Sequence, residues 1–151
     1  MGEGQPVRFV VDVMLGSLAR WLRRMGYDAD YANQRADPEL VRIARAENRV
    51  LLTRDRELAG HRGVRALLVE SQTLDEQLAQ VTAAFPLAPG SAPGRCSECN
   101  SPLVEVAPEE VAHRVPAYVL RHHTRFQRCP GCHRIYWQGS HWKSMQVRLE
   151  P

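Results

Sequence analysis

The stretch FVVDVMLGSLARWLRRMGYD, from Phe9 to Asp28, places a strand, a carboxylate and a basic helix in immediate succession. The apolar, β-branched residues up to Val11 are typical of a buried parallel strand, which has no packing reason to end in a charge such as Asp12. In an open α/β sheet, ligands bind outside the carboxyl ends of the strands. The position of Asp12 therefore favours a functional role over a packing role.

From Leu15 the sequence changes to a helical period, with one apolar side and one basic side. Gly26 is expected to end this helix as the C′ residue. The basic side is expected to be a solvated helix face, which contacts phosphate only if the nearby carboxylates form a site. Its members are Ser17, Arg20, Arg23 and Arg24.

The following segments continue the alternation of strand and helix. Short apolar runs predict strands over residues 29–31, 50–53 and 66–69, and helix-start patterns at Asp37 and Thr73 predict the helices between and after them. This order is typical of a parallel sheet covered on both faces, so the fold class is α/β. Functional residues are then expected at the carboxyl edge of the sheet.

A short segment rich in proline and glycine divides the chain. Residues 86–94 contain three Pro and two Gly, a composition typical of a linker. We therefore expect one domain over residues 1–85 and a small second domain over residues 95–151. No apolar run approaches the roughly 20 residues that span a bilayer, and the start of the chain lacks the pattern of a signal peptide, so we expect a cytoplasmic protein with no membrane contact.

Positive charge is concentrated in the last third of the chain. Residues 1–94 hold 12 Arg against 12 Asp and Glu, whereas residues 95–151 hold seven Arg and one Lys against five Glu, together with five of the six His. If some of the N-terminal carboxylates surround a metal ion, the rest of that surface is also basic. This distribution favours a polyanionic partner.

Four cysteines stand in two Cys-x-x-Cys pairs, which is the arrangement of a zinc ribbon. Four thiolates complete the tetrahedral shell of Zn²⁺ and leave no open position, so the predicted site is structural. Two disulfides, or four free thiols in a core, are the alternatives, and His133 or His141 replacing one ligand is a further one. The predicted ligands are Cys96, Cys99, Cys129 and Cys132.

Three carboxylates are expected at the carboxyl edge of the sheet: Asp12 after the first strand, Asp37 at a helix start and Asp55 after the third strand. Clustered carboxylates repel one another unless a cation lies among them, and hard oxygen ligands suit Mg²⁺ or Mn²⁺. Glu57 is a candidate for a fourth oxygen. The alternatives are an N-cap role for Asp37, with Pro38 at N1, and an ordinary exposed charge at Asp55.

Five features of the sequence recur together in one known family. They are Phe9 to Ala29, Asp37-Pro-Glu-Leu40, Arg49-Val-Leu-Leu-Thr-Arg-Asp-Arg-Glu-Leu58, the four cysteines, and Tyr136-Trp-Gln-Gly-Ser-His-Trp142. In this order they resemble the Mut-seven C-terminal RNase domain family, and the resemblance covers residues 7–149. The family is grouped with the PIN-like nucleases and joins a nuclease fold to a C-terminal zinc ribbon.

The resemblance implies a metal-dependent ribonuclease that hydrolyses RNA phosphodiester bonds. It implies that Asp12, Asp37 and Asp55 hold Mg²⁺ or Mn²⁺, with Glu57 as the fourth candidate among the catalytic residues, and that RNA is the partner. Basic residues are expected to contact the phosphates. These are Arg20, Arg23, Arg54, Arg134 and Lys143. Further candidates for RNA contact in the ribbon are Arg121, Arg125, Arg128, Tyr136 and Trp142. Trp137 is expected to belong to the ribbon core.

Two other functions are consistent with parts of the sequence. A non-catalytic RNA- or ribosome-binding adaptor with vestigial carboxylates would show the same basic C-terminal region. A phosphotransfer domain would also place an Asp after a parallel strand, but it needs adjacent carboxylates or an Asp-x-Asp motif. Asp12 is followed by Val13 and Met14, which disfavours that function.

Overall fold

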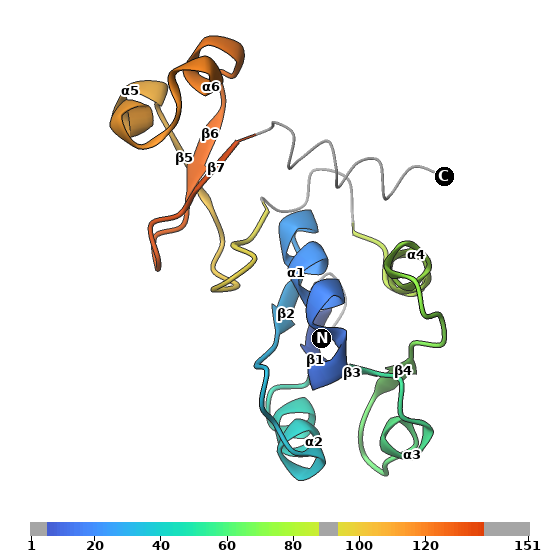
Figure 1. Ribbon diagram of the computed structural model, residues 1–151. Helices are drawn as coiled ribbons and strands as arrows, with labels where there is room; N and C mark the ends of the chain where they lie inside the picture. Colours follow the sequence, from blue (N-terminus) through green and yellow to red (C-terminus); the bar gives the residue numbers. More distant parts are fainter. Residues whose placement is uncertain (1–5, 88–93, 138–151) are drawn as a thin grey trace.

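The computed structural model describes residues 6–87 and 94–137, and its chain path is shown in Figure 1. The N-terminal module, residues 6–87, contains a four-stranded parallel sheet, and the C-terminal module, residues 94–137, contains a three-stranded antiparallel sheet. The predicted α/β class is confirmed. The predicted domain boundaries stay predictions, because most of the proposed linker lies outside the described residues.

The parallel sheet has the strand order β2-β1-β3-β4. Phe9 pairs with Ala29 on one side and with Val50 on the other, so β1 lies in the interior of the sheet. All four strands point the same way, and their carboxyl ends share one edge. The strands are β1 (Arg8–Val11), β2 (Asp28–Asp30), β3 (Val50–Thr53) and β4 (Ala66–Leu68).

Helices cover both faces of this sheet (Figure 1). Alternate β1 residues belong to different cores: Phe9 and Val11 pack with α1 and α4, whereas Val10 packs with α2 and α3. This is the period of two that a strand buried on both faces requires. The helices are α1 (Gly16–Met25), α2 (Asp37–Ala46), α3 (Arg56–Ala59) and α4 (Leu74–Ala84).

The helix starts agree with the sequence prediction in one case and differ in another. Thr73 is the N-cap of α4, and its hydroxyl accepts a hydrogen bond from the Glu76 amide at 3.3 Å. The predicted N-cap at Asp37 is wrong by one residue, because Ala36 has the extended cap conformation and Asp37 is the first helical residue. A carboxylate in the first turn still interacts favourably with the helix dipole without bonding the backbone.

The C-terminal module is built around the cysteine pairs. Its sheet, in the order β5-β6-β7, contains β5 (Val104–Val106), β6 (Phe126–Arg128) and β7 (Ile135–Trp137). The short runs that follow the two cysteine pairs in the sequence form β5 and β7. Both pair with the intervening β6, which the sequence patterns did not predict.

Two short helices fill the long separation between the cysteine pairs. They are α5 (Pro108–Val111) and α6 (Ala117–His122), joined by the 3-10 turn Ala112–Arg114. Val111 and Val119 pack with Phe126 in a small core of their own, and Trp137 packs against Phe126 with ring centroids 6.5 Å apart. Trp137 therefore belongs to a core, as predicted. No helix in the described part of the chain is long and apolar enough to cross a membrane.

Candidate functional site

Asp12 follows β1 directly, at the carboxyl edge of the parallel sheet, and is 6% exposed. Its Oδ1 accepts a hydrogen bond from the Val13 amide at 2.7 Å, and its Oδ2 accepts one from the Thr53 hydroxyl at 2.7 Å. Both donors are neutral, and no ion pair joins Asp12 to any residue that the structure describes. A buried carboxylate with unused lone pairs and no cationic partner is suited to ligating a metal ion.

Thr53, the last residue of β3, connects two of the predicted site residues. Its side chain is fully buried, and its hydroxyl donates to Asp12 Oδ2 and accepts from the Asp55 amide at 3.0 Å. Thr53 therefore positions the Asp12 carboxylate and the start of the loop after β3 relative to each other. Sequence reasoning gave Thr53 no role of its own, although its place in the Thr-x-Asp motif was a usable signal.

Asp55 is exposed and acts as the N-cap of α3. Its Oδ1 accepts hydrogen bonds from the amides of Glu57 at 2.9 Å and Leu58 at 3.2 Å. Glu57 is exposed in the first turn of that helix, and Asp37 is exposed in the first turn of α2. In residues 6–87 and 94–137, the cysteines are the only group in which three or more potential ligand atoms lie within 4.8 Å of one another.

Asp12 and Asp55 thus share an edge, but the predicted carboxylates are not gathered into one cluster. Asp12 and Asp55 follow neighbouring strands and are linked through Thr53, whereas no hydrogen bond joins Asp37 or Glu57 to Asp12 among the described residues. The oxygen donors present fit a hard divalent cation such as Mg²⁺ or Mn²⁺ in their chemistry.

A polar hollow of about 200 Å³ lies at the same edge, where β3 and β4 end. It is lined by Arg54 and Arg56 from the loop and helix after β3, and by Glu70 after β4. Arg54 is half-buried. The structure therefore places the predicted phosphate contact Arg54 beside Asp55, on the side of the sheet where the carboxylates are found.

The four cysteines form a compact cluster that could hold one metal ion, with their Sγ atoms within 4.8 Å of one another. Cys96 and Cys129 are fully buried, Cys132 is half-buried and Cys99 is exposed. In each pair, the amide of the second cysteine donates to the first sulfur at 3.4 Å. Four thiol ligands from two tight turns are consistent with a structural zinc site.

No disulfide links these cysteines, so the disulfide alternative is disfavoured. The Sγ atoms of Cys96 and Cys132 are 3.7 Å apart, whereas a disulfide bond is about 2.05 Å long. Burial opposes ionisation of Cys132, but hydrogen bonds from the Arg134 amide and guanidinium favour the thiolate and lower its pKa to about 6. Arg134, a predicted RNA contact, therefore also supports the thiolate form that a metal ion requires.

Arg23 and Arg24 do not lie on a solvated helix face, so that expectation is wrong. Both are 5% exposed, because the C-terminal module covers this side of α1. The Arg23 Nε donates to the Ala29 carbonyl at 2.8 Å, and its Nη1 donates to the Ser97 carbonyl at 2.7 Å. Arg23 is therefore committed to joining the modules and is not available to a phosphate group.

The neighbouring arginines differ in their exposure. The Arg24 guanidinium lies 4.3 Å from the centre of the Tyr136 ring, and the Tyr136 hydroxyl lies 3.2 Å from the Cys96 Sγ. Burial raises the pKa of Tyr136 to about 12, and its ring is covered by the protein. Arg20 alone of the three keeps an exposed side chain, 50% accessible, with its Nε 3.8 Å from the Glu98 carboxylate.

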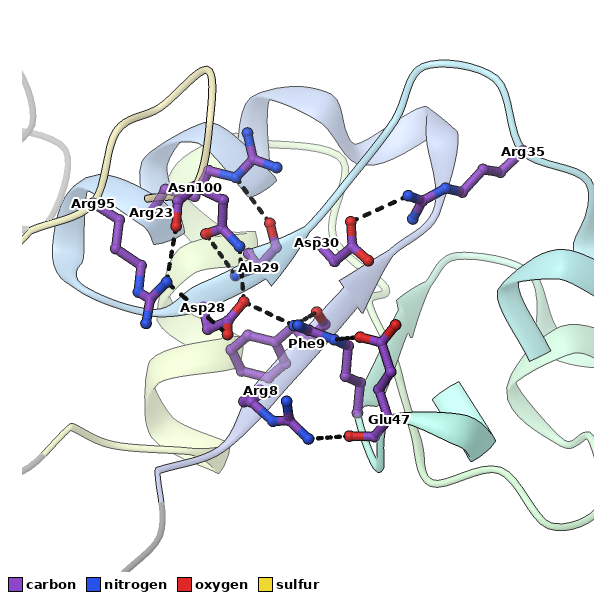
Figure 2. Close-up of polar contacts among 11 residues, drawn as sticks. Arg8, Phe9, Arg23, Asp28, Ala29, Asp30, Arg35, Glu47, Arg95 and Asn100 are labelled. Carbon is purple, nitrogen blue, oxygen red and sulfur yellow. Dashed lines mark hydrogen bonds and ion pairs between the residues drawn. The ribbon is translucent and has the colours of Figure 1, made fainter. Parts of the chain in front are cut away.

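Figure 2 shows a second set of contacts between the modules, centred on Asp28 at the amino end of β2. The Asn100 side chain donates to Asp28 Oδ1 at 2.8 Å and accepts from the Ala29 amide at 3.1 Å, which extends the hydrogen bonding of β2. Arg49 donates to the same carboxylate at 2.8 Å, and Arg95 lies 4.0 Å from it.

These contacts perturb the ionisation of Asp28. Burial alone would raise its pKa, but the hydrogen bonds from Arg49 and Asn100 and the charges of Arg49 and Arg95 outweigh burial and lower it. Sequence reasoning missed this residue, because its ribbon partners are about 70 positions away in the chain. The C-terminal module therefore docks at the amino end of β2, on the opposite edge of the sheet from Asp12.

Three of the expected RNA or metal contacts lie outside the described residues. They are His141, Trp142 and Lys143, and their roles stay predictions.

Comparison with protein families gives a match over most of the chain. The family model described as Mut7-C RNAse domain matches residues 7–149, and thereby both modules. No curated protein and no solved structure matches the chain. Because the family match covers nearly the whole sequence, the chain belongs to the Mut7-C RNAse domain family.

Proposed function

We propose that this protein is a metal-dependent ribonuclease that hydrolyses RNA phosphodiester bonds at the carboxyl edge of its parallel sheet. The observation that carries the proposal is the Asp12 carboxylate, which is 6% exposed, has neutral donors only and is tied through Thr53 to the Asp55 loop. Membership of an RNase domain family supports RNA as the substrate class.

The residues at this edge have distinct roles in the proposal. Asp12 and Asp55 hold Mg²⁺ or Mn²⁺, with Asp37 and Glu57 as further carboxylates on the exposed side. Such an ion, when bound, activates a water molecule and stabilises charge on the phosphate. Arg54 attracts the phosphate to the hollow beside Asp55.

Replacing Asp12 by Asn tests the proposal most directly. The variant keeps an oxygen for the Val13 amide but loses the charge. We expect Mn²⁺-dependent cleavage of a single-stranded RNA pool to fall by more than about 100-fold, since loss of even an outer-shell partner of a metal ligand costs about 10–100-fold. The matched control is Glu39→Gln, an exposed carboxylate of α2, which should cleave normally. Unchanged cleavage by Asp12→Asn would overturn the site.

Thr53 provides a test of positioning at the same edge. Thr53→Val keeps the shape of the side chain but removes the hydroxyl between Asp12 and Asp55, and should lower cleavage by about 10–100-fold. Thr53→Ser keeps the hydroxyl and should restore most of the rate. A structural role would instead make the melting temperature fall in both variants while the rate per folded molecule stayed unchanged. Dependence of the rate on Mn²⁺ concentration separates the two cases, because a mispositioned ligand weakens metal binding.

A non-catalytic RNA-binding adaptor is the second candidate. Two observations favour it. One carboxylate oxygen of Asp55 is used to cap α3, and the carboxylates of the described residues are not clustered. Wild-type protein that binds RNA but cleaves none of it with Mg²⁺ or Mn²⁺ would support the adaptor and reject the nuclease.

A further inference from the structure

The C-terminal module contains a hollow of about 480 Å³ that neither the carboxylates nor the cysteines use. It lies between the α5 region and strands β6 and β7. Ile135 and Pro130 provide its accessible apolar surface, and Val111 borders it but is buried. Its polar surface is largely basic, with Arg128 from β6 and with His113, Arg114 and His133 from the adjoining turns.

The two arginines of this hollow are held differently. The Arg114 Nη1 donates to the His133 carbonyl at 2.7 Å, which fixes one end of its guanidinium, and no other hydrogen bond or ion pair joins that group to the described residues. Arg128 is half-buried, and no hydrogen bond or ion pair joins its side chain to another residue in the described part of the chain. A guanidinium is always charged, so partial burial without a counter-charge is unfavourable.

One carboxylate lines the hollow and does not neutralise it. Glu110 belongs to the first turn of α5, and its Oε2 accepts a hydrogen bond from the Ala107 amide at 3.0 Å. No ion pair links Glu110 to Arg114 or Arg128 within the described residues. The hollow therefore combines two arginines and two imidazole groups with a single carboxylate that is engaged in capping a helix.

We propose that this hollow binds a backbone phosphate of RNA and anchors the strand at a distance from the edge where it is cleaved. Paired guanidinium groups match the geometry of phosphate oxygens, and the imidazoles supply further donors. Ile135 and Pro130 offer an apolar surface to the adjoining ribose or base. The choice of RNA as the ligand rests on the proposed function.

The position of the hollow makes the anchor dependent on RNA length. The C-terminal module docks at the amino edge of the sheet, whereas Asp12 and Asp55 lie at the carboxyl edge. Figure 1 shows α5 and α6 at the far end of the molecule from α3, which Asp55 caps. Helix α1 spans the space between the two edges, and its ten residues rise about 15 Å. An RNA shorter than this cannot occupy both places.

Binding of RNAs of two lengths tests the anchor in the full-length, zinc-loaded protein. The probes are two labelled single-stranded RNAs, used without added Mg²⁺ or Mn²⁺. One has about 20 nucleotides, and the other is a dinucleotide, whose single phosphodiester cannot occupy both places. We expect Arg128→Ala to raise the Kd for the long RNA by about 10-fold and to reduce the slope of log K against log salt by about one. The short RNA should be cleaved by Arg128→Ala at the wild-type rate once Mn²⁺ is added.

Two further variants control this experiment. Arg62→Ala removes an exposed arginine of the N-terminal module that neither lines the hollow nor belongs to the expected RNA contacts, and should change the Kd for the long RNA less than Arg128→Ala does. Arg128→Lys keeps the charge but not the forked donors, and should bind with an intermediate Kd. A wild-type Kd and salt slope in Arg128→Ala, with an unchanged melting temperature, would overturn the anchor.

The experiments test the RNA anchor and the proposed nuclease activity separately. If wild-type protein cleaves no RNA but Arg128→Ala weakens binding of the long strand, the anchor holds and the proposed function fails. If Asp12→Asn abolishes cleavage but Arg128→Ala binds the long strand normally, the nuclease holds and the anchor is rejected.

Discussion

The two edges of the parallel sheet differ in whether their buried charged side chains have partners of opposite charge. At the amino edge, Asp28 is held by Arg49, Asn100 and Arg95, and each charge has a partner. At the carboxyl edge, Asp12 is buried with neutral donors only. Charges that are fully paired hold the two modules together, whereas a buried charge without a partner is a candidate for ligand binding.

Helix α1 shows the same contrast along a single element. Arg23 and Arg20 are one turn apart, yet Arg23 is 5% exposed and bonds two carbonyl groups, whereas the Arg20 side chain is 50% exposed. Residue type and helical position are nearly the same for the two. The difference arises from the C-terminal module, which covers the last turns of the helix.

The largest effect on folding is expected from a substitution in the cysteine cluster, because the C-terminal module that docks at the amino edge depends on this cluster. Cys129→Ser should lower the zinc content from about one ion per chain to none and unfold the C-terminal module, since structural zinc contributes about 10–16 kcal/mol in small zinc domains. Metal analysis and limited proteolysis measure both effects. Ser97→Ala keeps the four thiols and the backbone carbonyl that Arg23 contacts, and should retain zinc. Zinc-free wild-type protein under reducing conditions would contradict the metal site.

A smaller effect, on stability and not on metal content, is expected from Arg23→Ala. The buried carbonyl of Ala29 and the part-buried carbonyl of Ser97 would lose their donor. Each such loss costs about 1–3 kcal/mol, so the free energy of unfolding should fall by about 2–6 kcal/mol. Arg20→Ala is the matched control and should cost less than about 1 kcal/mol, as exposed ion pairs do. Equal urea midpoints for the two variants would contradict the prediction that Arg23 contributes more to stability than Arg20.

The smallest effect is expected from the charge of Asp28. Its pKa in the folded protein lies below the ordinary value of 3.8, so the carboxylate stabilises the fold above that pH and the contribution is lost as pH falls through the lowered pKa. Asp28→Asn should cost about 1–3 kcal/mol at pH 7. The difference in unfolding free energy from wild type should shrink below pH 3.8. A difference that stays constant with pH would show that shape and not charge joins the modules here.

Local patterns in the sequence were sufficient for the fold class, for most strands and helices and for the cysteine cluster. The alternation along β1 and the Cys-x-x-Cys spacings are short-range signals, which depend only on neighbouring residues. Short helices α5 and α6 escaped prediction because, at four and six residues, they are too short to show a clear helical period and are stabilised by packing on Phe126.

The sequence by itself determined that a carboxylate ends a buried strand at Asp12 and that four cysteines stand at metal-binding spacing. Only the tertiary structure decided that Arg23 is buried, that Thr53 connects Asp12 to Asp55, and that Arg128 lies in a basic hollow. The physical reason is that helical and strand periods define which side chains share a face. What covers that face depends on contacts between residues far apart in the chain.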